Sequence, residues 1–447
     1  MAKNLFRILL FLSFGLVAQA QELKLSMQEA IDYAVKNNYD NQIATKNIEA
    51  AEERVWETTT IGLPQISGKV DFQNWFKQQI TPFDPASLNG ESSGVFSEFI
   101  FGQKQTLNPS LTLTQLLFDG SYLVGLQSAK TYLKISEQAK LKTELSVREA
   151  VVNAYGNVLV AEKSIAILNS NKTILQKSLD ETQKIFENGF TEEENVEQLQ
   201  ITLGTLENNI RNTKRLKEIA YQMLNITLGN PIDKKLELTD TLESLSTEKS
   251  LELLGKTFNI NNHIDYQIAM NNRQANELLV KYEKSKYLPS LAAYVNYGAN
   301  YFFDSYTFVS GEDKSWFDYS LLGVSLNVPI FSSFGKKSKI AQAKIELENS
   351  DIRLEQLKQQ LNLQAASAKS EYQLSIENYD SAKQNLVLAE RIEKKQQVKF
   401  IEGLSSSFDL SQAQNQLYTQ QSNYIQSMMN VIAKKAKLET ALNLPIK

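Results

Sequence analysis

The chain has 447 residues, of which 47 are basic and 51 acidic, and the formal net charge of −4 gives no electrostatic footprint for nucleic acid. It contains no Cys and a single His, His263. This excludes a cysteine nucleophile, a disulfide framework and a zinc cluster, and it all but excludes a His-based catalytic triad. The mean hydropathy of −0.32 is too low for a bundle of transmembrane helices. We therefore expect neither an enzyme nor a bound cofactor or metal.

The N-terminus has the layout of an export signal. Lys3 and Arg7 form a basic region, residues 8–17 are an apolar core, and Ala18-Gln19-Ala20 is a cleavage site. The sequence predicts a signal peptide over 1–20 and a mature chain that starts at Gln21. An anchor left in the membrane is the alternative, but the core is short for a spanning helix.

The remainder of the chain is an internal duplication. Residues 21–231 form the first repeat and 250–447 the second, joined by a polar linker, 232–249, that we expect to pack outside the helices. The matched positions are Leu63 with Leu288, Phe118 with Phe331, Gly189 with Gly403 and Leu228 with Leu442. The separation is larger for the first pair than for the other three, so the segment between this Leu and the Phe is longer in the first repeat.

Each repeat is predicted to contain one very long helix. Residues 110–230 and 330–444 lack Pro, and their apolar residues recur at alternating spacings of three and four, which is typical of packed helices. The long helices are predicted over 121–187 and 335–401. The shorter helices should stack end to end beside them; these are expected at 27–61 and 192–228 in the first repeat, and at 250–286 and 406–441 in the second.

Turn and cap signals separate the long helices from their return partners. Asn188-Gly189 is a helix stop, Thr191 with Glu194 is predicted to form a capping box, and Ser406 with Asp409 offers the same pattern after Gly403.

Two segments, 64–118 and 289–331, instead alternate apolar and polar residues and should each form two strands. Leu111-Thr112-Leu113-Thr114 matches Val324-Ser325-Leu326-Asn327 across the duplication. Aromatic residues gather near the strand ends, as in the girdles of membrane barrels; they include Trp75, Phe76, Tyr301, Phe302, Trp316 and Phe317. The apolar face of a soluble sandwich is the other interpretation of these strands.

Four strands from one chain cannot close a barrel, and an open strand edge is not tolerated in lipid. Chains must therefore combine, and three chains would supply twelve strands, an even number. The polar loops at 77–106 and 304–318 would then face outward.

The ordered, repeated set of Leu-Pro, strand pair, long helix and Gly-centred hairpin resembles the TolC-type outer-membrane efflux protein family. The resemblance implies a mixed α/β membrane protein: a homotrimer with a transmembrane twelve-stranded β-barrel that continues into a periplasmic α-helical barrel. It also implies a periplasmic adaptor and an inner-membrane pump of RND or ABC type as partners, in a tripartite efflux or type I secretion system.

In that family the periplasmic tip is a gate, often ringed by acidic residues. By position, Asp409 matches the first acidic residue, Gln412 stands where a second is often found, Asn195 is the first-repeat counterpart of Asp409, and Phe400 precedes the turn. Asp409 also suits a helix cap and Phe400 suits helix packing. Gly189, Phe190, Gly403 and Leu404 form the hairpin tips, where an adaptor would dock. His263 is predicted to be an ordinary polar helix residue.

The sequence thus predicts a passive, porin-like conduit that extends from the outer membrane into the periplasm. A soluble periplasmic coiled-coil scaffold or adaptor is one rival, and it should lack the four aromatic-rich strands. An envelope-associated hydrolase is the other, and it would need a catalytic constellation that this composition does not offer.

Overall fold

The computed structural model describes residues 23–100, 102–247, 251–303 and 316–444. The predicted signal peptide, the start at Gln21 and most of the loop predicted at 304–318 lie outside these residues. The chain divides into two compact units. Of the described residues, the first unit contains those up to Ile48, those within Ser136–Met270 and those from Arg353, and the second contains those within Glu49–Ile135 and Asn271–Ile352.

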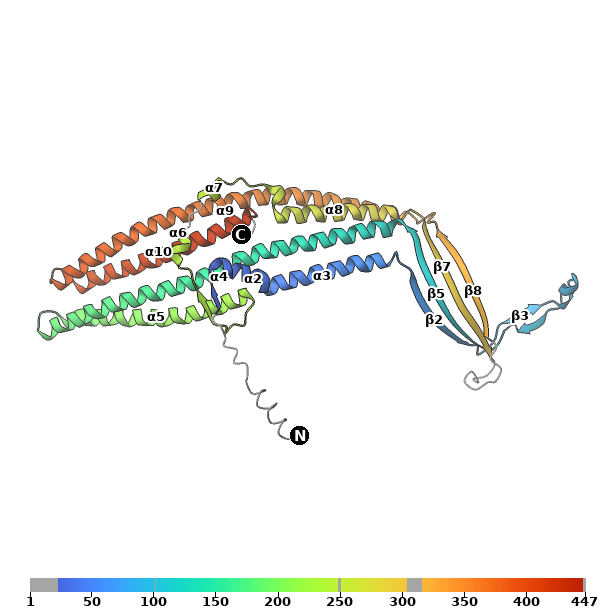
Figure 1. Cartoon of the computed structure of the whole chain (residues 1–447), viewed down its shortest axis with the longest axis horizontal. Coiled ribbons are helices and arrows are strands. Elements are labelled where there is room, and N and C mark those ends of the chain that lie inside the picture. Colours follow the sequence, from blue (N-terminus) through green and yellow to red (C-terminus); the bar gives the residue numbers. More distant parts are fainter. Residues whose placement is uncertain (1–22, 101, 248–250, 304–315, 445–447) are drawn as a thin grey trace, which may run out of the picture. The chain divides into compact units, whose positions relative to one another are not determined.

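The second unit is built on a four-stranded antiparallel sheet with the order β2-β5-β7-β8 (Figure 1). The strands are β2 (Gln65–Asn74), β5 (Gln105–Asp119), β7 (Ser290–Phe303) and β8 (Trp316–Asn327). Each repeat contributes one hairpin, β2–β5 or β7–β8, as the period-two pattern predicts. Both edge strands, β2 and β8, lack a second neighbour within the described residues.

The loop predicted at 77–106 is more ordered than expected. It contains a short ribbon of β3 (Ile80–Phe83) and β4 (Ser97–Ile100), with a 3-10 helix over Pro85–Asn89. Asp84 is buried at its turn and accepts hydrogen bonds from the Ala86 and Ser93 backbone N–H groups and from the Ser92 and Ser93 hydroxyls. A single carboxylate thus satisfies the donors of a turn that sequence periodicity does not reveal.

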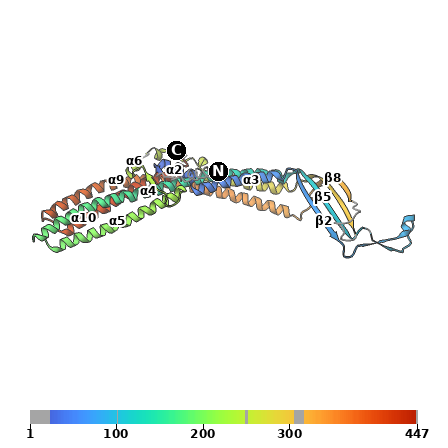
Figure 2. The same ribbon diagram turned by 60° about the horizontal axis from the view of Figure 1, so that its bottom comes forward.

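Two helical hairpins occupy most of the first unit, and they appear side by side in two views (Figures 1 and 2). The long helices are α4 (Gly120–Glu187) and α9 (Gly335–Ile401), each followed by its return helix, α5 (Glu193–Leu228) or α10 (Ser407–Ala441). Among the described helices, α4 alone has the length and apolar composition of a membrane span. Several of its apolar side chains, including Val151, Tyr155 and Val158, are instead fully buried in the core of this unit.

The first helix of each repeat is broken, contrary to the prediction. Residues 27–61 form α2 (Met27–Asn37) and α3 (Tyr39–Thr60). Residues 250–286 form α7 (Leu251–Gly255), a 3-10 turn (Ile260–Asn262) and α8 (Ile264–Ser285). The physical reason is a capping side chain at each break, Asn38 or His263, and these two positions correspond across the duplication.

The two capping residues make the same contacts. The Asp40 N–H donates to Asn38 Oδ1 (2.8 Å), and the Asp265 N–H donates to His263 Nδ1 (3.2 Å). The carbonyl of each accepts the first bond of the following helix, from Gln42 or Gln267. His263 is only 5% exposed, so it is not the ordinary polar helix residue that the sequence predicts.

The linker predicted to lie outside the helices is partly buried. It forms β6 (Leu236–Leu238), which pairs in parallel with β1 (Leu23–Leu25), and α6 (Leu242–Thr247). Leu236 and Leu242 are buried in the same core as Tyr155. The sequence did not predict this burial, because two leucines among many polar residues are enough to pack the segment against the core.

His263 gives the helical unit a pH dependence that can be measured. Burial lowers its pKa below the usual 6.5, and Lys142 lowers it further, whereas Asp265 opposes the shift. A lowered pKa means that the unfolded chain takes up the proton first, so stability is lost as pH falls through this range. We expect the melting temperature of the native chain to drop between about pH 7.5 and 5.5.

The matched variant is His263→Asn, because Asn is the residue that caps at position 38. It should keep the cap and remove this part of the pH dependence. Equal pH slopes for the two proteins, measured by circular dichroism, would contradict the assignment.

Candidate functional site

The tips of the two hairpins share one backbone geometry. Gly189 and Gly403 have φ of +78° and +73°. The Gly189 N–H donates to the Phe186 carbonyl (2.8 Å) and the Phe190 N–H to the Ile185 carbonyl (3.0 Å). Gly403 and Leu404 repeat these bonds with Phe400 and Lys399. Both hairpins therefore end their long helix in a Schellman motif, which requires a left-handed residue at the glycine.

Apolar side chains project from both tips. Phe190 is 83% exposed and Leu404 is 72% exposed. Each follows its glycine directly, at the position that usually packs back on the helix in such a motif. Large exposed apolar side chains at equivalent places are typical of a contact surface.

A cavity of about 570 Å³ lies between the tips. Both hairpins line it: Phe190, Thr191 and Asn195 belong to the first, and Phe400 and Ser405 to the second. The structure thus brings together two of the predicted gate residues, Asn195 and Phe400, with the tip residues Phe190 and Gly403. Phe400 also packs against the apolar cluster between α4 and α5, as predicted from its spacing.

Asp409 is held in a complete capping box. The Ser406 N–H (3.2 Å) and the Ser406 hydroxyl (2.8 Å) donate to Asp409 Oδ2, and the Asp409 N–H donates to Ser406 Oγ (3.2 Å). The hydrogen bonds from Ser406 lower the pKa of Asp409, so the carboxylate stays charged well below neutral pH. The side chain is exposed, as is Gln412 one turn further along.

The capping box predicted for Thr191 and Glu194 is not formed. Glu192 is the N-cap of α5 and makes no side-chain capping bond. The Thr191 hydroxyl instead accepts a hydrogen bond from Asn195 Nδ2 (3.0 Å). The T-x-x-E pattern cannot distinguish a helix whose N-cap is Thr191 from one whose N-cap is Glu192. Here Glu192 is the N-cap, and the Thr191 hydroxyl is bonded to Asn195.

Asn195 does not act as a copy of Asp409. Its Oδ1 accepts a hydrogen bond from the Ser407 N–H (3.3 Å), at the first residue of α10 in the other repeat. A second link joins the two long helices before the tips, where Gln397 Nε2 on α9 donates to Ser178 Oγ on α4 (3.3 Å). Sequence reasoning missed both cross-links, because local spacing gives no signal for a polar contact between repeats.

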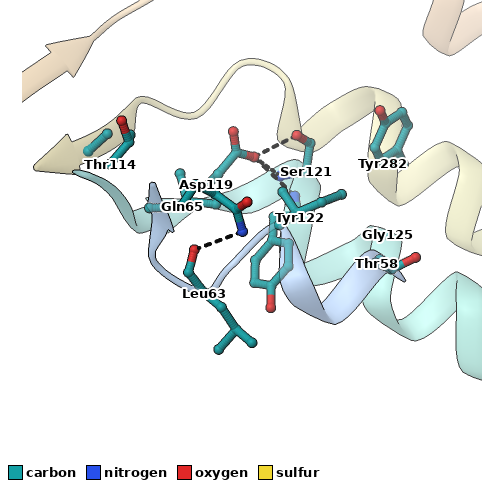
Figure 3. Close-up of a pocket in the computed structure, with 12 residues that line it drawn as sticks. Thr58, Leu63, Gln65, Thr114, Asp119, Ser121, Tyr122, Gly125 and Tyr282 are labelled. Atoms are coloured by element: carbon teal, nitrogen blue, oxygen red, sulfur yellow. Dashed lines mark hydrogen bonds between the residues drawn. The ribbon is translucent and has the colours of Figure 1, made fainter. Parts of the chain in front are cut away.

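A second cavity, of about 440 Å³, lies where the strands of the first repeat meet their helices (Figure 3). Asp119 Oδ1 caps α4 there by accepting from the Ser121 N–H (2.7 Å), the Ser121 hydroxyl (2.5 Å) and the Tyr122 N–H (3.0 Å). The Tyr122 hydroxyl donates to the Thr59 carbonyl (3.3 Å). These bonds fix the turn from strand to helix.

Among the described residues no group of His, Asp or Glu side chains could hold a metal ion. The geometry offers two kinds of site: paired helical tips with exposed apolar residues, and a sheet with two open edges. Together they define the fold of an outer-membrane channel chain.

The comparisons with known proteins agree with this fold. Residues 30–230 and 260–444 match the family described as outer membrane efflux protein. The chain belongs to that family, which confirms the resemblance inferred from the sequence and places the chain in the outer membrane with an extension into the periplasm. A search of curated protein sequences finds no match.

Three solved structures illustrate the likeness. The outer membrane protein VceC of Vibrio cholerae has a TM-score of 0.71 at 14% identity, over 94% of this chain and 97% of that one. The CmeC outer membrane channel of Campylobacter jejuni has 0.70 at 18%, over 93% and 85%. The MtrE outer membrane channel of Neisseria gonorrhoeae, in its open state, has 0.68 at 16%, over 93% and 88%.

Proposed function

We propose that three copies of the chain form a passive conduit, with a twelve-stranded barrel in the outer membrane and a helical tube in the periplasm. The observation that carries this proposal is the open sheet. Its strands range in length from β2, with 10 residues, to β5, with 15 residues, which suits a bilayer. Within the part of one chain that the structure describes, however, β2 and β8 have unpaired edges. A soluble scaffold or adaptor is not expected to contain such a sheet.

We infer that the conduit is passive. The composition supports this inference, because a chain with a single His and no Cys has few of the side chains that catalysis commonly uses. Energy would come from an inner-membrane pump of RND or ABC type, reached through a periplasmic adaptor.

The exposed Phe190 and Leu404, each beside its tip glycine, are the contacts we assign to the adaptor. Replacing both with Ser should abolish efflux in cells while leaving the conductance of the purified channel unchanged.

The assembly itself is tested by mass and conductance. Light scattering with detergent correction should give three chains per particle, because only partner chains can cover the edges of β2 and β8. The same preparation should open ion-conducting pores in a planar bilayer. A stable monomer in detergent, or trimers without conductance, would contradict the proposal of a trimeric conduit.

We assign to Asp409 the ion preference of the periplasmic entrance. A trimer repeats each side chain three times around one axis, and a ring of carboxylates favours cations. Asp409→Asn should therefore lower cation selectivity, measured as the reversal potential in a salt gradient. The amide keeps an acceptor for the Ser406 N–H, so the melting temperature should change little.

Gln412 supplies a matched variant of opposite sign. It lies three residues from Asp409 on the same helical face, so Gln412→Glu should add a second ring and raise cation selectivity. Unchanged reversal potentials in both variants, with a lowered melting point for Asp409→Asn, would leave Asp409 with a capping role alone.

A further inference from the structure

The two open edges of the sheet are complementary at the level of single residues. We propose that β8 of one chain pairs with β2 of the next copy in a register that the internal repeat fixes. This inference rests on the trimeric conduit proposed above and adds the residue pairs that would close the barrel.

The first step is that the repeat holds residue by residue in the sheet. In the β2–β5 hairpin Gln65 lies opposite Thr114, and in the β7–β8 hairpin Ser290 lies opposite Asn327. The second pair is the first one shifted along the chain by two offsets. The separation between Leu63 and Leu288 takes β2 to β7, and the separation between Phe118 and Phe331 takes β5 to β8. β7 is therefore the copy of β2, and β8 is the copy of β5.

The second step uses the junction between the repeats. β5 pairs with β7, so the end of one repeat meets the start of the next within the chain. The same junction, shifted by these two offsets, brings β8 onto β2 of a second copy. The observed pairs Thr112–Asn296, Leu113–Val295 and Thr114–Tyr294 become Ser325–Asp71, Leu326–Val70 and Asn327–Lys69 between chains.

The chemistry of the two faces supports this register independently. Leu326 meets Val70 on the apolar face, and Ser325 meets Asp71 on the polar face, since side chains alternate along each strand. A slip by one residue would place Leu326 opposite Asp71 or Lys69. In the pair observed within the chain, Asn296 Nδ2 donates to Thr112 Oγ1 (2.7 Å). The corresponding Ser325 hydroxyl and Asp71 carboxylate are again a donor and an acceptor.

The end of β8 gives a third observation. The last part of β5, residues 115–119, is a β-strand whose only pairing partner is β7, because β2 pairs with β5 only as far as Thr114. Its copy, residues 328–332, forms no strand in a single chain, and Ile330 is 93% exposed. The segment that lacks structure is the one whose only partner would be β2 of another copy.

The chain contains no Cys, so cross-linking can test the register directly. We would prepare the full chain in detergent as Ser325→Cys with Asp71→Cys, and as Leu326→Cys with Val70→Cys. Neighbouring antiparallel pairs alternate between wide and narrow spacing, so these two variants sample both types. Mild oxidation should convert most chains to covalent trimers on a non-reducing gel.

The matched control is Ser325→Cys with Lys69→Cys, which lies two residues out of register on the same face. Diagonal neighbours are about 7–8 Å apart, beyond the usual disulfide span. We expect at least about tenfold less covalent trimer from this control. Links within one chain are excluded, because β2 and β8 are separated by three strand spacings, about 14 Å.

The outcomes separate the register from the assembly. Covalent trimers from either in-register variant, with few from the control, support the inference. Three chains per particle with cross-links only in the control, or with none, overturn the register and leave the trimeric conduit standing. A monomer by light scattering overturns both.

Discussion

Gly229→Ala should strongly destabilise the helical unit, although the substitution adds one methyl group. Gly229 ends α5 with φ of +79°, and a Cβ there would lie 2.0 Å from the Asn37 carbonyl oxygen, at the end of α2. A left-handed conformation costs an L-residue about 1–2 kcal/mol, and forcing the backbones apart adds about 1–3 kcal/mol. The expected loss is about 2–5 kcal/mol of unfolding free energy, measured as a lower urea midpoint for the helical circular dichroism signal.

Gly189→Ala and Gly403→Ala are the matched controls. Both glycines are left-handed, but a Cβ at either would meet nothing within 4 Å. These variants should lose only the free energy that a left-handed backbone costs an L-residue, and the effect should be confined to the tips. Equal losses at Gly189, Gly403 and Gly229 would show that the contact with Asn37 is unimportant.

The second repeat shows why the clash is decisive. The counterpart of Gly229 in that repeat is Asn443, which is also left-handed, with φ of +52°. Its Oδ1 accepts from the Ile264 N–H (3.2 Å) and its Nδ2 donates to the Asn262 carbonyl (2.9 Å). At this one position the second repeat joins its stacked helices through an asparagine side chain, whereas in the first repeat the two backbones approach closely.

Arg148→Met should cost about 3 kcal/mol of stability, since it leaves a mostly buried carboxylate without its partner. Arg148 on α4 forms an ion pair with Glu439 on α10, and the two side chains are 13% and 16% exposed. The contact joins the two repeats within the helical unit. Thermal melting should show the loss, and adding Glu439→Gln to the variant should recover most of it.

Lys24→Met is the control for this pair. Lys24 and Glu237 also form an ion pair (2.7 Å), but both side chains are well exposed. Solvent weakens such a pair, so the variant should stay within about 0.5 kcal/mol of the native chain. A comparable loss in the two variants would assign the effect of Arg148 to something other than burial.

The sequence predicts well where a local signal exists. Pro-free runs and the glycines at 189 and 403 gave the long helices, and strand alternation gave both hairpins. The breaks at Asn38 and His263 were missed because a capping side chain inside an amphipathic run leaves the apolar period intact. The burial of Leu236 and Leu242 depends on tertiary contacts, which short windows of sequence do not contain.

The tip residues divide in the same way. Gly189, Gly403 and the Ser406–Asp409 box follow from helix-end chemistry, and the structure has them as predicted. The role of Asn195 does not, since its partner, Ser407, lies 212 residues away. Polar links between repeats depend on how two hairpins meet, so they can be recognised only in three dimensions.

The parallel pairing of β1 with β6 has a consequence for folding order. Leu23 pairs with Leu236, and the Met27 N–H donates to Asp240 Oδ2 (2.6 Å) across 213 residues of sequence. Closing so long a loop costs conformational entropy before any contact repays it, which makes such pairings late. A chain that is translocated N-terminus first would therefore hold residues 23–25 unpaired until the whole first repeat has followed, so this small sheet would record the completion of that repeat.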